Sequence, residues 1–394
     1  MPGLRQQLPA RVAAAARRRG RFAASLLVRP LGPVPPRPDV APAPVRLLIG
    51  PANFAGQAWE WARAAERDLD GVAATVLGVQ DRFAFPADYA VPPELYTSAR
   101  WSLEQRRWVE RSFTHVLLDG VRPVTGPLLA RDARRDAATF RKAGLAVGLI
   151  AHGSEVRLPS RHRVLFPYSP FEPDLPETQR LQAHAERFGG VLARDPGPVF
   201  VSTPDLLDFA PRATWLPLVV DRAPWRSDAP VLERARPVVV HVPSNPWLKG
   251  SAAADAVLRG LHDAGRIEYR RLEGVASAEV PALVADADVV LDQLVLGCYG
   301  VMSVQAMLAG RVVVSHVAEH VRARFPAPPP VVECGPDGLS ALVEEVLDDR
   351  DRFREIAARG PAYAADLHDG RRSAQALAGF LGRPAGGEAP AAAR

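Results

Sequence analysis

Two short stretches of the sequence place polar side chains where a buried strand gives way to a helix. In the first, His241–Gly250 (HVPSNPWLKG), Ser244, Asn245 and Lys249 follow a run of valines. Lysine is a mobile point charge, and a hydroxyl and helix N–H groups are hydrogen-bond donors, so this combination suits a diphosphate. The alternative is a lysine that is only solvated on a surface loop.

The second stretch, residues 285–317, has the pattern of a strand, a glycine loop, a helix and another strand. Residues 289–291 are typical of a buried parallel strand, and Gly297 and Gly300 follow where the backbone must turn. A helix that begins at such a loop directs free N–H groups and the positive end of its dipole at an anion. The alternative is an ordinary strand–helix–strand crossover that binds nothing.

Four further side chains are candidates. His152, directly after a predicted strand, would accept or orient a substrate hydroxyl, or only cap the strand end. Gln305, one turn into the helix, would reach a sugar hydroxyl or contact only its neighbours. Asp292 would hydrogen-bond a ligand or stay solvated, and Tyr299 would stack on a ligand or, as we expect, pack.

Strands and helices alternate along the chain at the spacing of parallel, doubly wound sheets, whose ligands bind at the carboxyl ends of the strands. The loops after Gly50, Gly120 and Ala151 should therefore share one rim. Strands are predicted at 46–50, 72–79, 115–120, 145–151, 198–202, 236–242, 267–272, 289–291 and 312–314. Helices are predicted at 57–68, 93–113, 127–144, 177–188, 250–265, 280–287, 301–308, 339–359 and 361–381.

The 394 residues exceed one domain of roughly 150 residues, so two domains are expected. We predict a basic, proline-rich arm and linker at 1–44, Rossmann-like domains at 45–220 and 236–381, and a disordered tail at 382–394. Hydrophobic residues make up 47% of the chain, an ordinary value for a globular protein. No apolar run approaches the ~20 residues that span a bilayer.

The net charge of +5 is concentrated in the arm, whose eight arginines face one acid, Asp39; the rest of the chain carries −2. The folded part therefore has no positive excess for binding nucleic acid. The arm is either a basic amphipathic helix that lies on an anionic membrane or a poorly ordered extension. Cys298 and Cys334 are too few for a disulfide framework or a zinc site, which fits a reducing cytoplasm.

Taken together, several motifs resemble the family-4 type glycosyltransferases of the GT-B fold. The motifs are HGSEVR at 152–157, VSTPDLL at 201–207, WLPLVVD at 215–221, HVPSNPWLKG at 241–250 and DQLVLGCYGVMSVQAMLAGRVVV at 292–314. The resemblance implies two Rossmann-like domains that face a cleft and a nucleotide-sugar held mainly by the C-terminal domain. It also implies transfer with retention, without a metal and with no cofactor beyond the nucleotide-sugar as co-substrate.

The resemblance also implies roles for individual residues. Lys249 would contact the donor diphosphate, the loop through Gly300 would approach the phosphates and the sugar, and His152 would lie at the reaction centre. The predicted donor-binding set is Ser244, Asn245, Lys249, Asp292, Tyr299, Gly300 and Gln305. The acceptor would lie against the loop that contains Asn53, Phe54 and Gly56.

The sequence departs from the family at two positions, Gly297 and Gln305, where the family commonly has glutamates. Gly297 lacks a contact with the donor sugar, which Asp292 or Gln293 would have to replace. Gln305 keeps one acceptor oxygen for the ribose hydroxyls but loses the charge.

The predicted function is a cytoplasmic glycosyltransferase acting on a cell-surface, polysaccharide or lipid-linked acceptor. The alternative is a non-catalytic relative that binds sugar-nucleotides or a partner.

Overall fold

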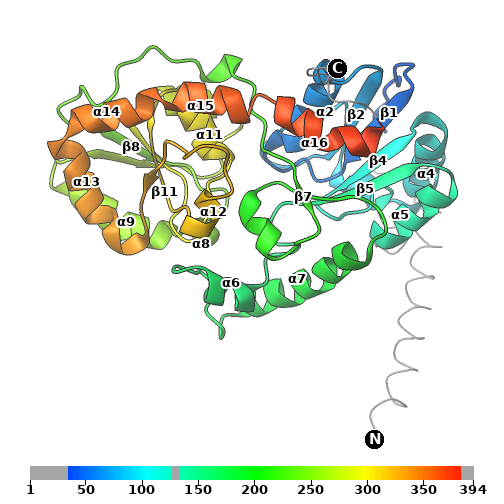
Figure 1. The fold of residues 1–394 in the computed structure, drawn as a ribbon, viewed down its shortest axis with the longest axis horizontal. Helices are drawn as coiled ribbons and strands as arrows, with labels where there is room; N and C mark the ends of the chain where they lie inside the picture. Colours follow the sequence, from blue (N-terminus) through cyan, green and yellow to red (C-terminus); the bar gives the residue numbers. More distant parts are fainter. Residues whose placement is uncertain (1–33, 127–132, 383–394) are drawn as a thin grey trace, which may run out of the picture.

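The structure is a computed structural model that describes residues 34–126 and 133–382. Within these ranges the chain forms two parallel β-sheets covered by helices, and the two domains lie side by side (Figure 1). The predicted α/β class with two Rossmann-like domains is therefore confirmed. Residues 34–44 of the predicted linker form no helix or strand. The rest of the predicted arm and the tail after residue 382 lie outside the described residues.

The first sheet has the strand order β3-β2-β1-β4-β5-β6-β7. Its strands are β1 (Val45–Gly50), β2 (Val72–Val79), β3 (Tyr89–Val91), β4 (His115–Asp119), β5 (Ala146–Ala151), β6 (Val199–Val201) and β7 (Thr214–Trp215). Its helices are α2 (Gln57–Asp68), α3 (Pro93–Tyr96), α4 (Ala99–Ser112), α5 (Ala133–Lys142), α6 (Pro159–Leu165) and α7 (Pro176–Arg194). The helix predicted at 93–113 is divided because Ser98 is extended and caps α4, accepting a hydrogen bond from the Trp101 N–H.

The second sheet has the strand order β12-β11-β10-β8-β9. Its strands are β8 (Val238–His241), β9 (Glu268–Arg271), β10 (Val289–Leu291), β11 (Val312–Ser315) and β12 (Val332–Glu333). The helices that follow are α8 (Pro246–Lys249), α9 (Ser251–Asp263), α10 (Val280–Ala285), α11 (Val301–Leu308), α12 (Glu319–Arg322), α13 (Leu339–Asp348), α14 (Arg350–Ala358), α15 (Gly360–Leu367) and α16 (Arg371–Leu381).

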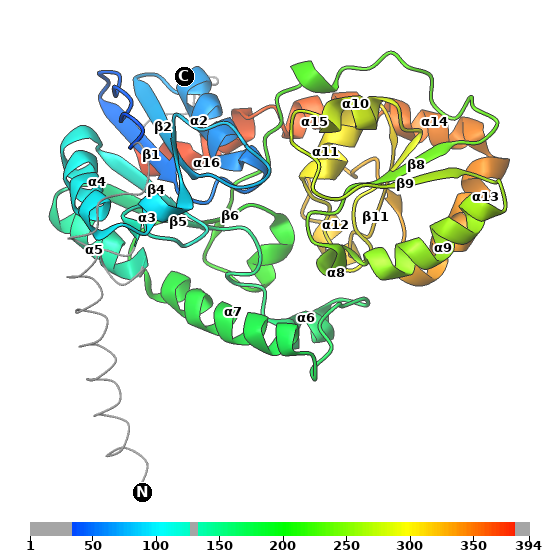
Figure 2. The ribbon, with the colours of Figure 1, turned by 180° about the vertical axis from the view of Figure 1, so that it is seen from behind.

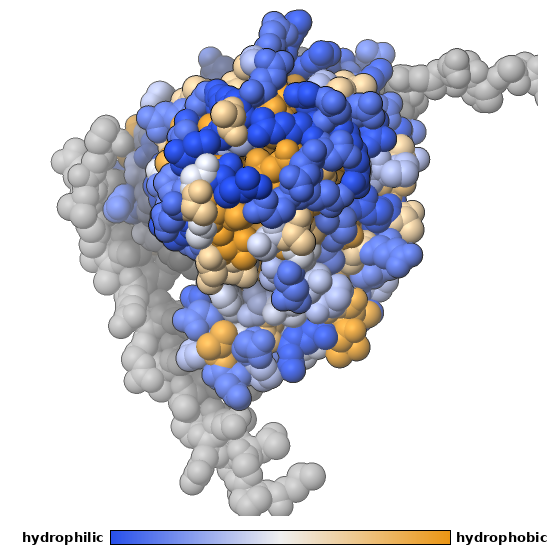
Figure 3. All heavy atoms as spheres, turned by 90° about the vertical axis from the view of Figure 1, so that its left-hand side faces the viewer, coloured by the Kyte–Doolittle hydropathy of each residue, from blue (hydrophilic) through white to orange (hydrophobic). Residues whose placement is uncertain are grey.

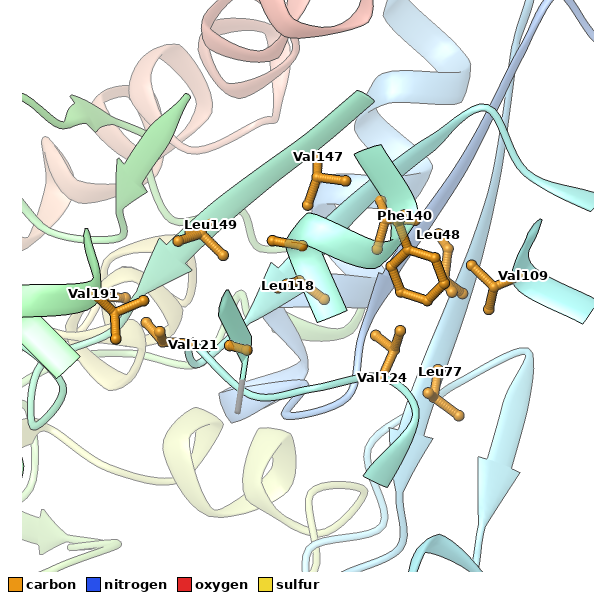
Figure 4. Close-up of a cluster of buried hydrophobic side chains, with 14 of the residues drawn as sticks. Leu48, Leu77, Val109, Leu118, Val121, Val124, Phe140, Val147, Leu149 and Val191 are labelled. Atoms are coloured by element: carbon orange, nitrogen blue, oxygen red, sulfur yellow. The ribbon is translucent and has the colours of Figure 1, made fainter. Parts of the chain in front are cut away.

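The central strands of each sheet are buried on both faces, which explains their apolar sequences, whereas the edge strand β9 (EYRR) is only half-buried. In β4 and β5, Leu118 and Leu149 lie on one face, in the same cluster as Phe140 of α5 (Figure 4). Leu117 and Ile150 lie on the opposite face, because successive side chains of a strand alternate. The second sheet is enclosed in the same way by two further clusters.

Helices α13 and α14 cover the end of the second domain that lies farthest from the first. They bury Leu342, Val346 and Phe353 and expose charged side chains such as the ion pair of Glu345 with Arg352. The resulting end face is mostly hydrophilic, with smaller apolar areas between the charged side chains (Figure 3). These two helices are therefore amphipathic elements of an outer surface.

Helix α16 packs on the first domain, against α2 (Figure 1). Leu377 and Leu381 share a buried cluster with Leu47 and Trp61 of that domain. The chain turns at Gly370, whose φ of +103° is a left-handed conformation that favours glycine. The predicted boundary at 381 is therefore corrected: the helix predicted at 361–381 is two helices, and α16 belongs by packing to the first domain.

Leu377→Ala is expected to destabilise the first domain by about 2–5 kcal/mol, because it deletes a fully buried side chain from the contact with α2. Hydrogen exchange should then accelerate at the amides of β1 and not at those of β8. Leu258→Ala, which removes an equally buried leucine from α9, is the matched control and should show the reverse. Acceleration in β8 alone on Leu377→Ala would assign α16 to the second domain.

Candidate functional site

Each sheet has one place where the strand order reverses: between β1 and β4 in the first domain and between β8 and β10 in the second. Ligands of open parallel sheets bind beyond the carboxyl ends of the strands at this switch point, because the flanking connections run to opposite faces. A buried aspartate stands at both places, Asp119 at the end of β4 and Asp292 directly after β10. Both accept a hydrogen bond from a loop N–H and pair with a basic side chain, His152 for Asp119 and Lys249 for Asp292.

In the second domain, Asp292 joins Lys249 to the start of α11. Its Oδ1 accepts a hydrogen bond from the Lys249 Nζ at 2.5 Å. Its Oδ2 accepts from the Gly300 N–H at 2.7 Å and the Ser303 hydroxyl at 2.8 Å. Burial by itself would raise the pKa of Asp292, but Lys249 and the donors outweigh it and lower the pKa. The sequence predicts an anion at the N-terminus of α11. In the structure, the Asp292 carboxylate lies at this position.

Gln293 holds the glycine loop and is fully buried. Its Oε1 accepts from the Val295 and Leu296 N–H groups at 2.9 and 2.6 Å, and its Nε2 donates to the Cys298 carbonyl at 2.9 Å. The amide is used inside the protein, so Gln293 does not replace the contact that a side chain at 297 would make. The only sign in the sequence that Gln293 holds this loop is that it is a polar residue just after a predicted buried strand.

The other predicted donor residues differ in how available they are. Ser244 is exposed, and Asn245 caps α8 through its Oδ1, which accepts from the Leu248 N–H at 3.2 Å. Gln305 is half-buried, and its side chain makes no hydrogen bond to a described residue. Ser244 and Gln305 therefore keep free polar atoms, whereas Asn245 has its amide oxygen engaged.

Tyr299 is a core residue, which corrects its assignment to the donor-binding set. Only 2% of it is exposed, and its ring stacks on Phe325 with centroids 4.9 Å apart. Its hydroxyl lies 2.9 Å from the His368 Nε2, and the His368 Nδ1 donates to the Leu218 carbonyl at 2.8 Å. Tyr299 therefore stabilises the connection between the domains, in agreement with the expectation that its ring packs in the core.

In the first domain, Asp119 joins His152 to the loop after β1. One carboxylate oxygen pairs with the His152 Nε2 and the other accepts from the Asn53 N–H at 2.6 Å. Burial alone would lower the pKa of His152, but the Asp119 carboxylate outweighs it and the pKa is raised. No hydrogen bond joins the Nδ1 to a described residue. A carboxylate-oriented imidazole of this kind can bind or orient a hydroxyl through its second nitrogen.

Of the predicted acceptor loop, only Phe54 directs a side chain at His152, with ring centroids 5.2 Å apart. The Asn53 side chain is buried and donates to the Pro86 carbonyl at 2.8 Å, so its role is structural. Gly56 is buried at φ +73°, and a Cβ added there would lie 3.2 Å from the ring of Phe85. Of the three predicted acceptor-loop residues, Phe54 is therefore the one whose side chain lies against His152.

Residues 159–171, which we call the strap, reach from the first domain to the second. Within the strap, α6 lies in the space between α7 and the second domain (Figures 1 and 2). The Tyr168 ring meets His316 edge-on at 5.0 Å, and Phe171 meets Trp247 of α8 at 5.8 Å. The strap thus covers part of the rim where the strands of the second sheet end.

The strap also explains the departure at position 297. A Cβ on Gly297 would overlap the ring of Phe166, and the φ of +78° is itself unfavourable for other residues. Phe166 is held by His162, which stacks on it at 4.3 Å and contacts the Leu296 carbonyl through its Nε2 at 3.3 Å. An aromatic ring therefore occupies the space beside position 297.

A buried ion pair joins two motifs of the first domain, the one that begins at His152 and the one at 201–207. The Arg157 Nη2 donates to the Asp205 Oδ2 at 2.6 Å, and both side chains are buried. In the second domain, burial raises the pKa of the Cys298 thiol, and the charge of Asp205 adds to the effect.

Within residues 34–126 and 133–382, no helix is long and apolar enough to cross a membrane. The same ranges contain no group of three or more histidine, cysteine, aspartate or glutamate side chains placed to hold a metal ion.

No family model and no curated protein matches the chain. Solved structures do. Sucrose-phosphate synthase from Thermosynechococcus elongatus superposes with a TM-score of 0.57 at 11% identity, covering 84% of this chain and 96% of that one. HepE from Anabaena, in complex with UDP-glucose, gives 0.56 at 13% identity, covering 86% and 99%. WaaG, a glycosyltransferase involved in lipopolysaccharide biosynthesis, gives 0.53 at 11%, covering 85% and 100%. The chain has the two-domain GT-B fold of these proteins.

Gly297→Ala is expected to destabilise the protein, because the strain of a positive φ, ~1 kcal/mol, adds to overlap with Phe166, about 1–3 kcal/mol. Phe166→Ala removes the obstacle, so the double variant should lose less unfolding free energy than the sum of the single variants. Gly144→Ala, at φ +89° with open space around it, is the matched control. Additive losses at 297 and 166 would contradict the packing described here.

Stability should also depend on pH through His162. Burial, with Arg157 nearby, lowers its pKa from 6.5 to about 3. Between these values the unfolded chain binds a proton that the folded chain does not, so stability is lost as pH falls below 6.5. At about pH 5 the loss is about 2 kcal/mol. In denaturant titrations at about pH 7.5 and 5, His162→Gln should flatten the pH dependence by this amount; an unchanged slope would contradict the assignment.

Proposed function

We propose that the protein is a glycosyltransferase that moves a sugar from a nucleoside diphosphate sugar to a cell-surface, polysaccharide or lipid-linked acceptor. Retention of configuration and independence of metals are parts of the proposal. The observation that carries it is the convergence of Lys249 and the N-terminus of α11 on the switch point of the second sheet. The fold supports it, because HepE is described with UDP-glucose and WaaG with lipopolysaccharide biosynthesis.

Lys249 supplies the electrostatic part of the reaction. It gives one N–H to Asp292 and keeps 19% of its side chain exposed, which leaves further N–H groups for a diphosphate. Negative charge grows on the diphosphate as its bond to the sugar breaks, so a cation held in advance stabilises the transition state more than the ground state. Lys249 would therefore both bind the donor diphosphate and stabilise it as the leaving group.

His152 supplies the orienting part at the other switch point. Its Nε2 is fixed by Asp119, so the Nδ1 has a defined direction from which to bind a hydroxyl of the sugar or of the acceptor. Both switch-point carboxylates are already hydrogen-bonded, Asp119 to His152 and Asp292 to Lys249. The proposed catalysis therefore relies on positioning and electrostatics rather than on an acid–base pair of carboxylates.

A cytoplasmic location and contact of the N-terminal arm with an anionic membrane belong to the same proposal. Both cysteines are free, as in a reducing compartment. The arm has the charge that an anionic surface attracts, ~1 kcal/mol for each arginine near it.

The sequence contains only two lysines, Lys249 and the exposed Lys142 of α5. Acetylation followed by mass spectrometry therefore reports the proposed site against an internal reference. UDP-glucose and other nucleotide-sugars should slow acetylation of Lys249 and leave Lys142 unchanged. Equal protection of both, or of neither by any nucleotide-sugar, would remove Lys249 from the donor site.

Lys249→Gln should weaken binding of nucleoside diphosphates by about 1.5–3 kcal/mol, roughly ten- to hundredfold, because a charged hydrogen bond is lost. Glutamine keeps a donor for Asp292, so the fold should remain intact. Lys142→Gln is the matched control and should bind as the wild type does in calorimetry. Unchanged affinity in Lys249→Gln would contradict the proposal.

A second candidate function is a non-catalytic relative that still binds sugar-nucleotides. The specific observation in its favour is the Phe166 ring beside Gly297, which leaves no room for a side chain at that position. Gln305 adds to it, because an amide replaces the family's carboxylate. A product assay with every donor that binds separates the two functions. Inert wild type, and an inert Gln305→Glu variant, would favour the binding protein.

A further inference from the structure

Arg122 lies beside His152 at the switch point of the first sheet. It comes three residues after the end of β4, and its backbone N–H donates to the Asp119 carbonyl at 3.3 Å. Its guanidinium lies over the ring of Phe54, 4.9 Å from the centroid, and that ring meets His152 edge-on. Three side chains from the loops after β1, β4 and β5 therefore adjoin one another.

The guanidinium of Arg122 is exposed and forms no ion pair or hydrogen bond with a described residue. The nearest acid by sequence, Asp119, is committed to His152 and Asn53. Glu155 is buried and accepts from the N–H groups of His152 and Gly153 at 3.1 and 3.0 Å. Both acids accept hydrogen bonds from other residues, Glu155 through its Oε2 alone, and neither forms an ion pair with Arg122.

Helix α7 adds to the same positive environment. Burial lowers the pKa of His184 of α7; Glu155 opposes this shift, and the charges of Arg122, Arg187 and Arg180 add to it. Neither Arg180 nor Arg187 forms an ion pair with a described residue, and both are exposed. In the second domain, by contrast, the cation Lys249 forms an ion pair with Asp292.

An unpaired guanidinium fixed over an aromatic ring has a specific chemical preference. Its fork of N–H donors matches the two oxygens of a carboxylate or phosphate, and the ring restricts its orientation. The half-buried Phe54 offers an apolar surface at the same place. An uncharged acceptor would leave this charge without a partner.

We propose that the acceptor carries an oxyanion, a phosphate or a carboxylate, and that Arg122 binds it beside the imidazole of His152. The proposal rests on the proposed glycosyltransferase function, because it assigns the acceptor class of that reaction. Arg122 is then a specificity-determining residue of the acceptor side, separate from the donor diphosphate site at Lys249.

Binding of simple charged sugars tests the proposal on the full chain. In saturation-transfer NMR, glucuronate and glucose 6-phosphate should bind, and glucose at the same concentration should bind roughly tenfold more weakly or worse. Arg122→Gln should remove the difference between charged and uncharged sugars. Arg135→Gln, an exposed arginine of α5 in the same domain, is the matched control and should behave as the wild type does. Equal binding by Arg122→Gln and wild type would overturn the proposal.

Two comparisons separate this proposal from the donor site and identify the oxyanion. Lys249→Gln should lose nucleotide binding and keep the charged sugars, whereas Arg122→Gln should do the opposite. Loss of the charged sugars on Lys249→Gln alone would place them at the donor site and overturn the proposal. If no nucleotide binds but the charged sugars still bind through Arg122, the proposed glycosyltransferase function is contradicted and the oxyanion site is not. Preference for glucose 6-phosphate or for glucuronate distinguishes phosphate from carboxylate.

Discussion

Two buried aspartates, one at the end of a central strand in each sheet, organise the loops on which the rest of the site depends. A carboxylate away from water is costly unless its oxygens are hydrogen-bonded and its charge is balanced. Asp119 meets this requirement with His152 and the Asn53 N–H, and Asp292 meets it with Lys249 and the start of α11. The same bonds fix the directions of the His152 and Lys249 side chains, so one set of hydrogen bonds both anchors the loops and orients the groups proposed to act on the ligand.

The strap adds a constraint that the sheets alone do not impose. Its rings cover the rim of the second sheet, and Phe166 fills the space beside Gly297, so the missing side chain there follows from packing between domains. The fold is shared with glycosyltransferases at 11–13% identity, and one fold supports many chemistries. The functional argument therefore rests on the two switch points, where the second domain offers Lys249 and the first offers a second, unpaired cation in Arg122.

Local patterns decided a large part of the fold. The predicted bounds of α2, β2, β10 and α11 agree with the structure, because hydrophobic periodicity and glycine or proline breaks act over a few residues. The same patterns placed Lys249, Asp292 and Gly300 together, since each follows a strand of one parallel sheet or begins the helix after it. The edge strands β3, β7 and β12 were missed, because β7 and β12 have only two residues and β3 lacks the run of branched apolar residues that marks the equally short β10.

What the sequence by itself determined was therefore the alternation of strands and helices, the two domains and the strand ends at which polar side chains gather. Only the tertiary structure decided that Tyr299 is buried, that α16 returns to the first domain and that the strap reaches the second. These features depend on contacts between residues tens to hundreds of positions apart. Such contacts have no local periodicity, so no pattern within a short window of sequence encodes them.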